Sequence, residues 1–333
     1  MLRRAEPACA TLALLVSSHA MDDDIESRLE ARLGRPHARQ RLGIEGEDEA
    51  RVLGGGLNFF HIENWYLAPS LIRNALRLTG LYGRGRRNAE NVELRRNLVA
   101  LPHLPSAFEG FTILQLSDLH VEISGGAMRR AVELLPEARY DIAVMTGDFR
   151  AGTVGPFDGT IASLARLRAH LAGPVYGVLG NHDTIRMVPE MEAMGIRMLL
   201  NEAETIARGG ERIHLAGIDD AHYFRVDNIE KAASGIPRGA VSILLSHTPE
   251  IYRRAAHAGF DLMLSGHTHG GQICLPGGIP ITLDSRLPRR FGAGAWRYHG
   301  MQGYTSVGTG SCIVAVRFNC LPEMTLHRLT RGQ

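Results

Sequence analysis

The stretch FTILQLSDLH, residues 111–120, joins an apolar run to a short polar turn. The run Phe111–Leu116 has the composition of a buried strand. Asp118 and His120 follow it directly. Because residues two apart in an extended chain point to the same side, we expect these two side chains to face one point in space.

The same order, an apolar run followed by polar side chains, recurs four times toward the C-terminus. The further runs are Ile142–Met145, Val175–Leu179, Val241–Leu245 and Leu262–Leu264. The polar residues that follow them are Asp148; Asn181, His182 and Asp183; His247; and His267 and His269. Open α/β sheets place their sites beyond the carboxyl ends of the strands. The series therefore predicts one site that is assembled from five strand ends.

Helical stretches separate several of the apolar runs. They lie around Met128–Leu135, Ile161–Leu171 and Glu250–Ala258. Alternation of this kind predicts an α/β domain in layers, with helices that cover the sheets.

The chemistry of the polar residues indicates a metal site. Carboxylate, amide and imidazole ligands together suit manganese, iron or zinc better than calcium. Seven such ligands exceed the number that one tetrahedral ion takes, which indicates two divalent ions. Each residue alone has a plainer explanation: Asp148 as a helix cap, Asn181 as a turn residue, or a histidine in a structural hydrogen bond. These explanations do not account for the ordered series.

This series of motifs resembles that of the calcineurin-like metallophosphoesterases over residues 92–330. The resemblance implies a four-layer α-β-β-α sandwich, two packed mixed β-sheets flanked by helices, as a catalytic domain at 91–333. It also implies one ion on Asp118, His120, Asp148 and His269, and a second ion on Asp148, Asn181, His247 and His267. His182 would be the acid that faces the substrate, and Asp183 would steady the His182 imidazole.

Further motifs are similar to those of one branch of the family, which contains bacterial phosphodiesterases of lipid-linked pyrophosphates such as UDP-2,3-diacylglucosamine. They are Leu200-Asn201-Glu202, Gly217-Ile218-Asp219-Asp220, Gly270-Gly271-Gln272 and Pro322-Glu323. We therefore expect hydrolysis of phosphodiester or pyrophosphate bonds by a hydroxide held between the two ions, with a phosphorylated small-molecule or lipid-linked substrate.

Three alternatives stay open: a nucleotide phosphodiesterase or nuclease, a protein phosphatase, and a non-catalytic scaffold. The scaffold is disfavoured because every ligand position is filled. The net charge is only +2, so no overall field attracts nucleic acid, and we expect no nucleic-acid partner.

The N-terminal part has a different composition. Residues 1–56 are expected to be a poorly ordered segment, with a loose helix as the alternative for residues 21 to about 55. Within it, Ala8–Val16 is either a weak export signal or sequence upstream of the true start at Met21. No run reaches the ~20 apolar residues of a membrane span. Four widely spaced cysteines suit a reducing compartment, so a cytoplasmic location is expected.

Residues 57–90 are expected to form an amphipathic helical appendage. An aromatic cluster, Phe59, Phe60, Trp65 and Tyr66, precedes apolar positions at helical spacing between 71 and 78. The same part carries the basic residues Arg73, Arg77, Arg84, Arg86 and Arg87. Two interpretations stand: residues 57–88 pack on the catalytic domain, or they lie on the anionic inner face of a membrane.

Overall fold

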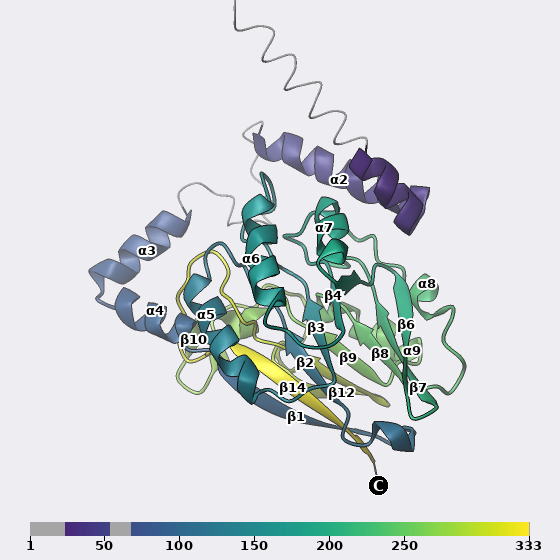
Figure 1. The fold of residues 1–333 in the computed structure, drawn as a ribbon. Helices are drawn as coiled ribbons and strands as arrows, with labels where there is room; N and C mark the ends of the chain where they lie inside the picture. The colour runs from purple at the N-terminus through teal and green to yellow at the C-terminus, as the bar shows by residue number, and fades with distance from the viewer. Residues whose placement is uncertain (1–23, 54–67, 333) are drawn as a thin grey trace, which may run out of the picture.

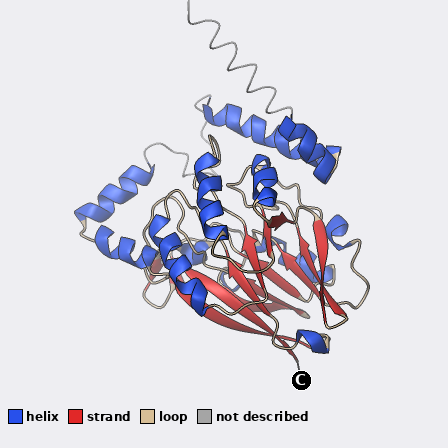
Figure 2. Ribbon diagram, viewed as in Figure 1, coloured by secondary structure: helices blue, strands red, loops and turns tan. Residues whose placement is uncertain are grey.

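The structure, a computed structural model, describes residues 24–53 and 68–332. Two six-stranded sheets form its centre, and helices lie on their outer faces (Figure 1, Figure 2). The predictions for residues 1–20 and for the aromatic cluster at 59–66 lie outside the described residues.

The first sheet has the strand order β1-β14-β2-β3-β4-β5. Its strands are β1 (Glu93–Leu101), β2 (Thr112–Leu116), β3 (Ile142–Thr146), β4 (Val175–Val178), β5 (Ile196–Met198) and β14 (Glu323–Arg331). All neighbours are parallel except β14 and β2. The chain's last strand therefore enters the sheet between β1 and β2.

The second sheet has the order β12-β13-β9-β8-β7-β6. Its strands are β6 (Glu202–Arg208), β7 (Glu211–Gly217), β8 (Ser242–Leu245), β9 (Leu262–Ser265), β12 (Gly294–Tyr298) and β13 (Met301–Thr305). The pairs β12/β13 and β6/β7 are antiparallel, and the inner pairs are parallel. A separate hairpin pairs β10 (Cys274–Leu275) with β11 (Ile279–Pro280).

Strand β3 shows how side-chain alternation builds the layers. Ile142 and Val144 belong to the core between the two sheets, together with residues of β7, β8 and β9. Ala143 and Met145 point the other way, into the core beneath the outer helices. A strand that is buried on both faces reads as a continuous apolar run, which is the reason that the sequence marks these strands clearly.

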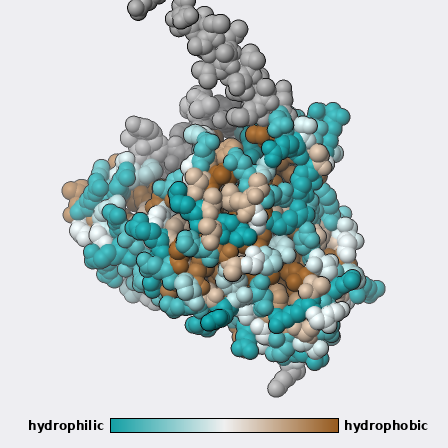
Figure 3. Space-filling model, viewed as in Figure 1, coloured by the Kyte–Doolittle hydropathy of each residue, from teal (hydrophilic) through white to brown (hydrophobic). Residues whose placement is uncertain are grey.

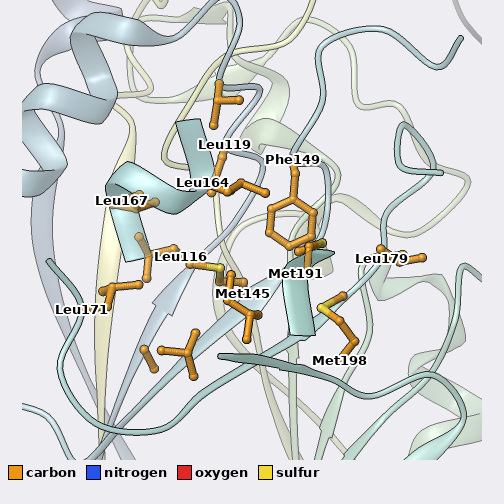
Figure 4. Packing of buried hydrophobic residues seen from close by; sticks show 14 of the residues in the cluster. Leu116, Leu119, Met145, Phe149, Leu164, Leu167, Leu171, Leu179, Met191 and Met198 are labelled. Carbon is orange, nitrogen blue, oxygen red and sulfur yellow. The ribbon is translucent and has the colours of Figure 1, made fainter. Parts of the chain in front are cut away.

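Outer helices cover both sheets. On the first sheet lie α5 (Gly125–Leu134), α6 (Asp158–Arg168) and α7 (Val188–Ala193). Figure 4 shows Leu164 and Leu167 of α6 and Met191 of α7 in this core. On the second lie α8 (Ile229–Ala233) and α9 (Tyr252–His257). The expected four-layer sandwich is therefore confirmed.

Residues 24–53 differ from the expected poorly ordered segment. They form a helix over 24–33 and then α2 (Arg35–Leu53). Leu29, Leu33 and Ala38 are buried in the core of the first sheet and its helices. Their spacing places them on one side of the two helices, so a few apolar contacts order a stretch that is otherwise rich in charge.

The described part of the expected appendage forms two helices, α3 (Ala68–Leu78) and α4 (Tyr82–Glu90). Helix α4 packs on the catalytic domain, where a Cβ at Gly85 would come within 2.7 Å of the Phe318 ring. Helix α3 leaves Leu71 and Leu78 exposed, and apolar surface is visible at that edge in Figure 3. Across the described ranges, none of the helices combines the length and apolar character needed to cross a bilayer.

Candidate metal centre

The carboxylate of Asp148 lies at the centre of the predicted site. Its Oδ2 atom is 3.3 Å from Nε2 of His247, 3.7 Å from Nε2 of His120 and 3.8 Å from Nε2 of His182. Three imidazole nitrogens thus approach one carboxylate oxygen from three different loops. All four side chains are buried or nearly so.

The remaining predicted ligands lie on either side of this centre. Nε2 of His269 is 3.1 Å from Nε2 of His120 and 3.5 Å from Oδ1 of Asp118. On the opposite side, Oδ1 of Asn181 is 3.0 Å from Nε2 of His247. His267 completes a group with Asp148 and His247, whose donor atoms all lie within 4.8 Å of one another.

The backbone that presents these side chains is not extended, contrary to the reasoning used for Asp118 and His120. Five of the seven predicted ligands have positive φ angles: Asp118 (51°), His120 (38°), Asp148 (56°), His267 (73°) and His269 (50°). Non-glycine residues rarely adopt this conformation, which costs roughly 1–3 kcal/mol each and is characteristic of functional sites. Left-handed backbone therefore turns the chain after β2, β3 and β9, three of the five strands that lead to the site.

Hydrogen bonds to the outer ring nitrogens orient two of the histidines. Nδ1 of His120 lies 2.6 Å from the carbonyl oxygen of Arg150, and Nδ1 of His247 lies 2.8 Å from that of Thr146. A carbonyl can only accept, so each Nδ1 donates its hydrogen, and in the neutral ring each Nε2 presents a lone pair to the centre. Metal-binding histidines are commonly held in this way.

The charges at the centre are unevenly distributed. Burial lowers the pKa of His247, but the Asp148 carboxylate outweighs it and raises that pKa to about 10. The same interaction holds the pKa of Asp148 well below its usual value, against the effect of burial. Burial, followed by nearby cationic groups, lowers the pKa of both His267 and His269, so these two are neutral. Neutral imidazoles beside a carboxylate are the forms that bind metal, and ligation by His247 requires loss of its proton.

Two buried atoms test whether a metal fits this site. Oδ2 of Asp118 and Nε2 of His267 are fully buried, and neither has a hydrogen-bond partner among the described residues. Buried polar atoms are nearly always partnered, and an unpartnered one needs an explanation such as an ion. Both belong to the predicted ligand set, so the residues present fit a divalent metal.

The contacts of Asp183 differ from those expected of a residue that steadies the His182 imidazole. Its two oxygens accept hydrogen bonds from the backbone N–H groups of Asp148, Phe149, Arg150 and Gly180, at 2.8 to 3.2 Å. Nδ1 of His182 is held instead by the carbonyl of Ala151 at 2.9 Å. Asp183 therefore joins two ligand loops, and burial raises its pKa to about 6.

Helix α2 supports the same loop from outside, through residues that the sequence reasoning missed. The fully buried Arg41 donates to the carbonyl oxygen of Asp183 at 2.7 Å and lies 3.3 Å from Oδ1 of Asp219. Glu45 accepts from the hydroxyl of Thr184 at 2.6 Å and from the N–H of Ile185 at 2.8 Å. The loop that carries Asn181 and His182 is thus fixed to α2. No sequence motif marks Arg41.

A pocket of about 330 Å³ opens onto the centre. Asp148, Asn181, His182, His267 and His269 line its polar side. Its apolar lining residues are Ile72, Ile273, Ile281, Ile313 and Val314, and Thr268, Gly271, Gln272, Thr282, Asp284 and Cys312 complete the lining. Ile72 comes from α3 and Ile281 follows β11, so the appendage and the small hairpin both border the pocket.

Other residues near the centre were also missed. The sulfur of Cys312 lies within 4.8 Å of ligand atoms of His120 and His269, and the Cys312 backbone is clamped by Gln272. The His222 ring lies against that of His267, with centroids 4.2 Å apart. A lone cysteine or histidine in sequence gives no signal of this kind, because its proximity depends on distant loops.

Comparison with known proteins places this geometry in a family. A sequence model described as calcineurin-like phosphoesterase matches residues 111–271. The uncharacterized metallophosphoesterase YkoQ of Bacillus subtilis is 29% identical over 73% of this chain and 92% of its own length. Phosphodiesterase YaeI of Escherichia coli is 28% identical over 66% of this chain and 82% of its own length. A transmembrane protein with metallophosphoesterase domain from Danio rerio is 30% identical over 68% of this chain and 55% of its own length.

Solved structures resemble the chain more loosely. The NAD nucleotidase of Haemophilus influenzae superposes with a TM-score of 0.42 at 15% identity, over 60% of this chain and 46% of that protein. The calcineurin-like phosphoesterase YfkN of Bacillus subtilis superposes with a TM-score of 0.39 at 14% identity, over 60% of this chain and 82% of that protein. Similarity at this level does not bear on substrate. The family match spans every predicted site residue, and the chain belongs to the calcineurin-like phosphoesterases, the metal-dependent hydrolases of phosphoesters.

Proposed function

We propose that this phosphoesterase holds two divalent ions and hydrolyses a phosphodiester or pyrophosphate bond in a lipid-linked substrate such as UDP-2,3-diacylglucosamine. The pocket supports this proposal, because its lining combines candidate metal ligands with isoleucine and valine side chains. Such a pocket suits a ligand with a charged phosphate at one end and an apolar body at the other.

The metal part of the proposal assigns Asp118, His120, Asp148 and His269 to one ion. Asp148, Asn181, His247 and His267 hold the other, with Asp148 shared. Manganese, iron and zinc suit this donor set. Bound divalent ions lower the pKa of water toward neutrality and neutralise phosphoryl oxygens.

His182 acts on the substrate in this proposal. Its Nδ1 hydrogen is held by the carbonyl of Ala151, so its Nε2 atom faces the pocket side of Asp148. A protonated Nε2 donates to a phosphoryl or leaving oxygen, typically a gain of ~10²–10⁴-fold in rate. The backbone N–H of His182 is held by Oδ1 of Asp148 at 3.0 Å, which fixes the position of the ring relative to the centre.

The apolar part of the proposal rests on the pocket rim. Ile72 of α3 and Ile281, which follows β11, line the pocket. Exposed apolar residues lie on the same two elements or next to them: Leu71, Leu78, Leu275, Ile279 and Ile281, each with at least half of its surface accessible. Apolar surface of this kind on a monomer indicates a lipid or protein contact. Peripheral contact with the inner face of a membrane would bring the pocket to a lipid-linked substrate.

A three-substrate assay of the metal-loaded protein tests the proposal. We expect hydrolysis of bis(p-nitrophenyl) phosphate and of a lipid-linked nucleotide pyrophosphate, slower hydrolysis of p-nitrophenyl phosphate, and loss of all three after chelation. A strong preference for the monoester would contradict the diester assignment. Equal kcat/KM for the lipid-linked compound and for its delipidated analogue would contradict the lipid-linked substrate alone.

A further inference from the structure

We propose that a second pocket beside the metal centre binds a further phosphate group of the substrate. This proposal rests on the proposed function and narrows its substrate class to molecules that carry two phosphates. The second pocket has a volume of about 380 Å³ and lies between α3, α4, α5 and residues 311–315. Ile313 and Val314 line both pockets, so the two are neighbours that share a wall.

The charged side chains of this second pocket are mainly basic. Arg73 enters from α3, Arg86 from α4 and Arg129 from α5, and Glu90 is the single acidic residue that lines it. Arg86 is paired with Glu90 at 3.0 Å. The charges of Arg86 and Glu90 balance each other, whereas the charges of Arg73 and Arg129, on facing helices, are not balanced by an acidic residue of the pocket.

The two remaining arginines are available to a ligand. Arg73 donates to the hydroxyl of Ser70 at 3.1 Å, a neutral acceptor on its own helix. Arg129 makes no hydrogen bond or ion pair with the residues that the structure describes, and its side chain is exposed. Because guanidinium groups match phosphate oxygens with paired N–H donors, phosphate is the anion that this arrangement suits.

The walls of the second pocket are tied to the metal centre. The carbonyl of Gly85 on α4 accepts from the N–H of Arg317 at 2.9 Å, and Asn88 donates to the carbonyl of Arg317 at 3.0 Å. The guanidinium of Arg317 in turn lies 3.2 Å from Nδ1 of His269. The spacing between the pockets is therefore set by one connected part of the chain, as a two-phosphate substrate requires.

Neighbouring arginines on the same helices provide a comparison. Arg77 of α3 lies over the ring of Tyr82, and Arg130 of α5 is paired with Glu133 at 3.1 Å. Neither lines the second pocket. A general attraction to anionic surfaces would involve all four arginines alike, whereas phosphate binding in the pocket involves only Arg73 and Arg129.

This difference defines the experiment. Full-length, metal-loaded protein is dialysed to equilibrium against radiolabelled inorganic phosphate, for the wild type, Arg73→Gln/Arg129→Gln and the matched control Arg77→Gln/Arg130→Gln. Both variants lose two positive charges from the same two helices. We expect the wild type and the control to bind phosphate at two sites, and the pocket variant to lose one site or bind there at least about tenfold more weakly.

Kinetics then identify the source of the phosphate. We expect kcat/KM for a nucleoside diphosphate diester, relative to that for bis(p-nitrophenyl) phosphate, to fall about tenfold in the pocket variant only. Unchanged phosphate binding in the pocket variant would overturn the proposal, and so would equal loss in the control. Absence of hydrolysis by metal-loaded wild type would instead count against the proposed function, because the dialysis does not depend on turnover.

Discussion

Asp148 and His182 are adjacent at the centre, but they differ in what they touch. Asp148 is approached by the Nε2 atoms of three histidines, so its carboxylate compensates most of the positive charge that the centre can hold. His182 reaches the pocket, and its outer nitrogen is fixed to a backbone carbonyl. These contacts lead to separate expectations for the two side chains.

Replacement of Asp148 by alanine should remove metal and activity together. Replacement of His182 by alanine should leave the metal content unchanged and lower kcat by ~10²–10⁴-fold. Elemental analysis and steady-state kinetics on the same preparations measure both effects. If the His182→Ala protein lost as much metal as the Asp148→Ala protein, His182 would be a ligand rather than a substrate-facing group.

His327 gives a prediction about stability instead of activity. Its Nδ1 accepts from the Asn97 amide at 3.1 Å, and its Nε2 donates to Oε1 of Gln115 at 2.9 Å, so the neutral ring is fully satisfied. Burial lowers the pKa of His327 to about 3. In the unfolded chain the His327 ring has a pKa near 6.5, so it becomes protonated at a pH at which the ring in the folded chain stays neutral.

The stability that His327 contributes is therefore complete above pH 6.5 and is lost as the pH falls toward 3. The loss should reach about 3 kcal/mol at pH 4. In His327→Gln, urea unfolding between pH 7 and pH 4 should show a shallower decline than in wild type. The exposed His103 provides the control, and His103→Gln should keep the wild-type slope. Parallel slopes in all three proteins would exclude His327 as the titrating group.

At the scale of elements, α2 connects an N-terminal helix to the catalytic loop. Arg41 is fully buried and contacts the Asp183 carbonyl, Glu45, Asp219 and the ring of Phe224. A truncation that begins at Asn91 would remove Arg41 and Glu45, and so would disturb the site itself. Point variants in α2 therefore test its role more cleanly.

Replacement of Arg41 by methionine leaves Asp219 buried without its cation, which typically costs about 3–5 kcal/mol. We expect a lower Tm and, well below that Tm, a lower kcat with little change in KM, because the loop of Asn181 and His182 loses its outer support. Arg39 on the same helix is exposed and paired with Glu30, and Arg39→Met should change neither quantity. A lower Tm with unchanged kcat would reduce Arg41 to a purely structural role.

The elements also show what the sequence could and could not predict. Strands β2, β3, β4, β8 and β9 were predicted because both of their faces are buried, which leaves a continuous apolar run. Strand β6 was missed because it is an edge strand with polar and half-exposed positions throughout. For residues 24–53 the sequence left both a poorly ordered segment and a loose helix open, because few of these residues are apolar and those that are pack against a distant sheet.

The candidate site also has features that the sequence could predict and features that it could not. The proposed ligand residues could be brought together from the sequence because each follows a strand, and parallel strands bring their ends to one edge. The role of Asp183 could not be predicted, since it depends on the direction of four backbone N–H groups in other loops. Left-handed backbone at Asp118 and His120 was also invisible in a residue pattern.

At the scale of the whole molecule, the centre lies where the two sheets meet. The loops after β2, β3 and β4 supply Asp118, His120, Asp148 and Asn181, and the loops after β8 and β9 supply His247, His267 and His269. Ile72 of helix α3 and Ile281, which follows the β10–β11 hairpin, line the pocket that leads to them. In the proposed function, a membrane would approach the molecule at these two elements.

The exposed rim residues give the last prediction. Full burial of one leucine or isoleucine contributes at most about 1.5–3 kcal/mol, so several together can hold a protein on a bilayer. We expect the full-length protein to sediment with anionic phospholipid vesicles, and the variant Leu71→Gln/Leu78→Gln/Ile279→Gln to remain in the supernatant. Leu98, which is 65% exposed and lies on β1, outside α3 and the β10–β11 hairpin, is the control.

Leu98→Gln should sediment like the wild type, because its loss of apolar surface lies away from the opening. Binding driven by the rim should also survive 0.5 M salt in part, since apolar burial is not screened, whereas arginine contacts with head groups weaken within a Debye length of ~4–5 Å at that concentration. If the triple variant sedimented as much as the wild type, the rim residues would not be the part of the protein that binds the vesicle. Complete release by salt would assign vesicle binding to the basic residues of α3 and α4 instead.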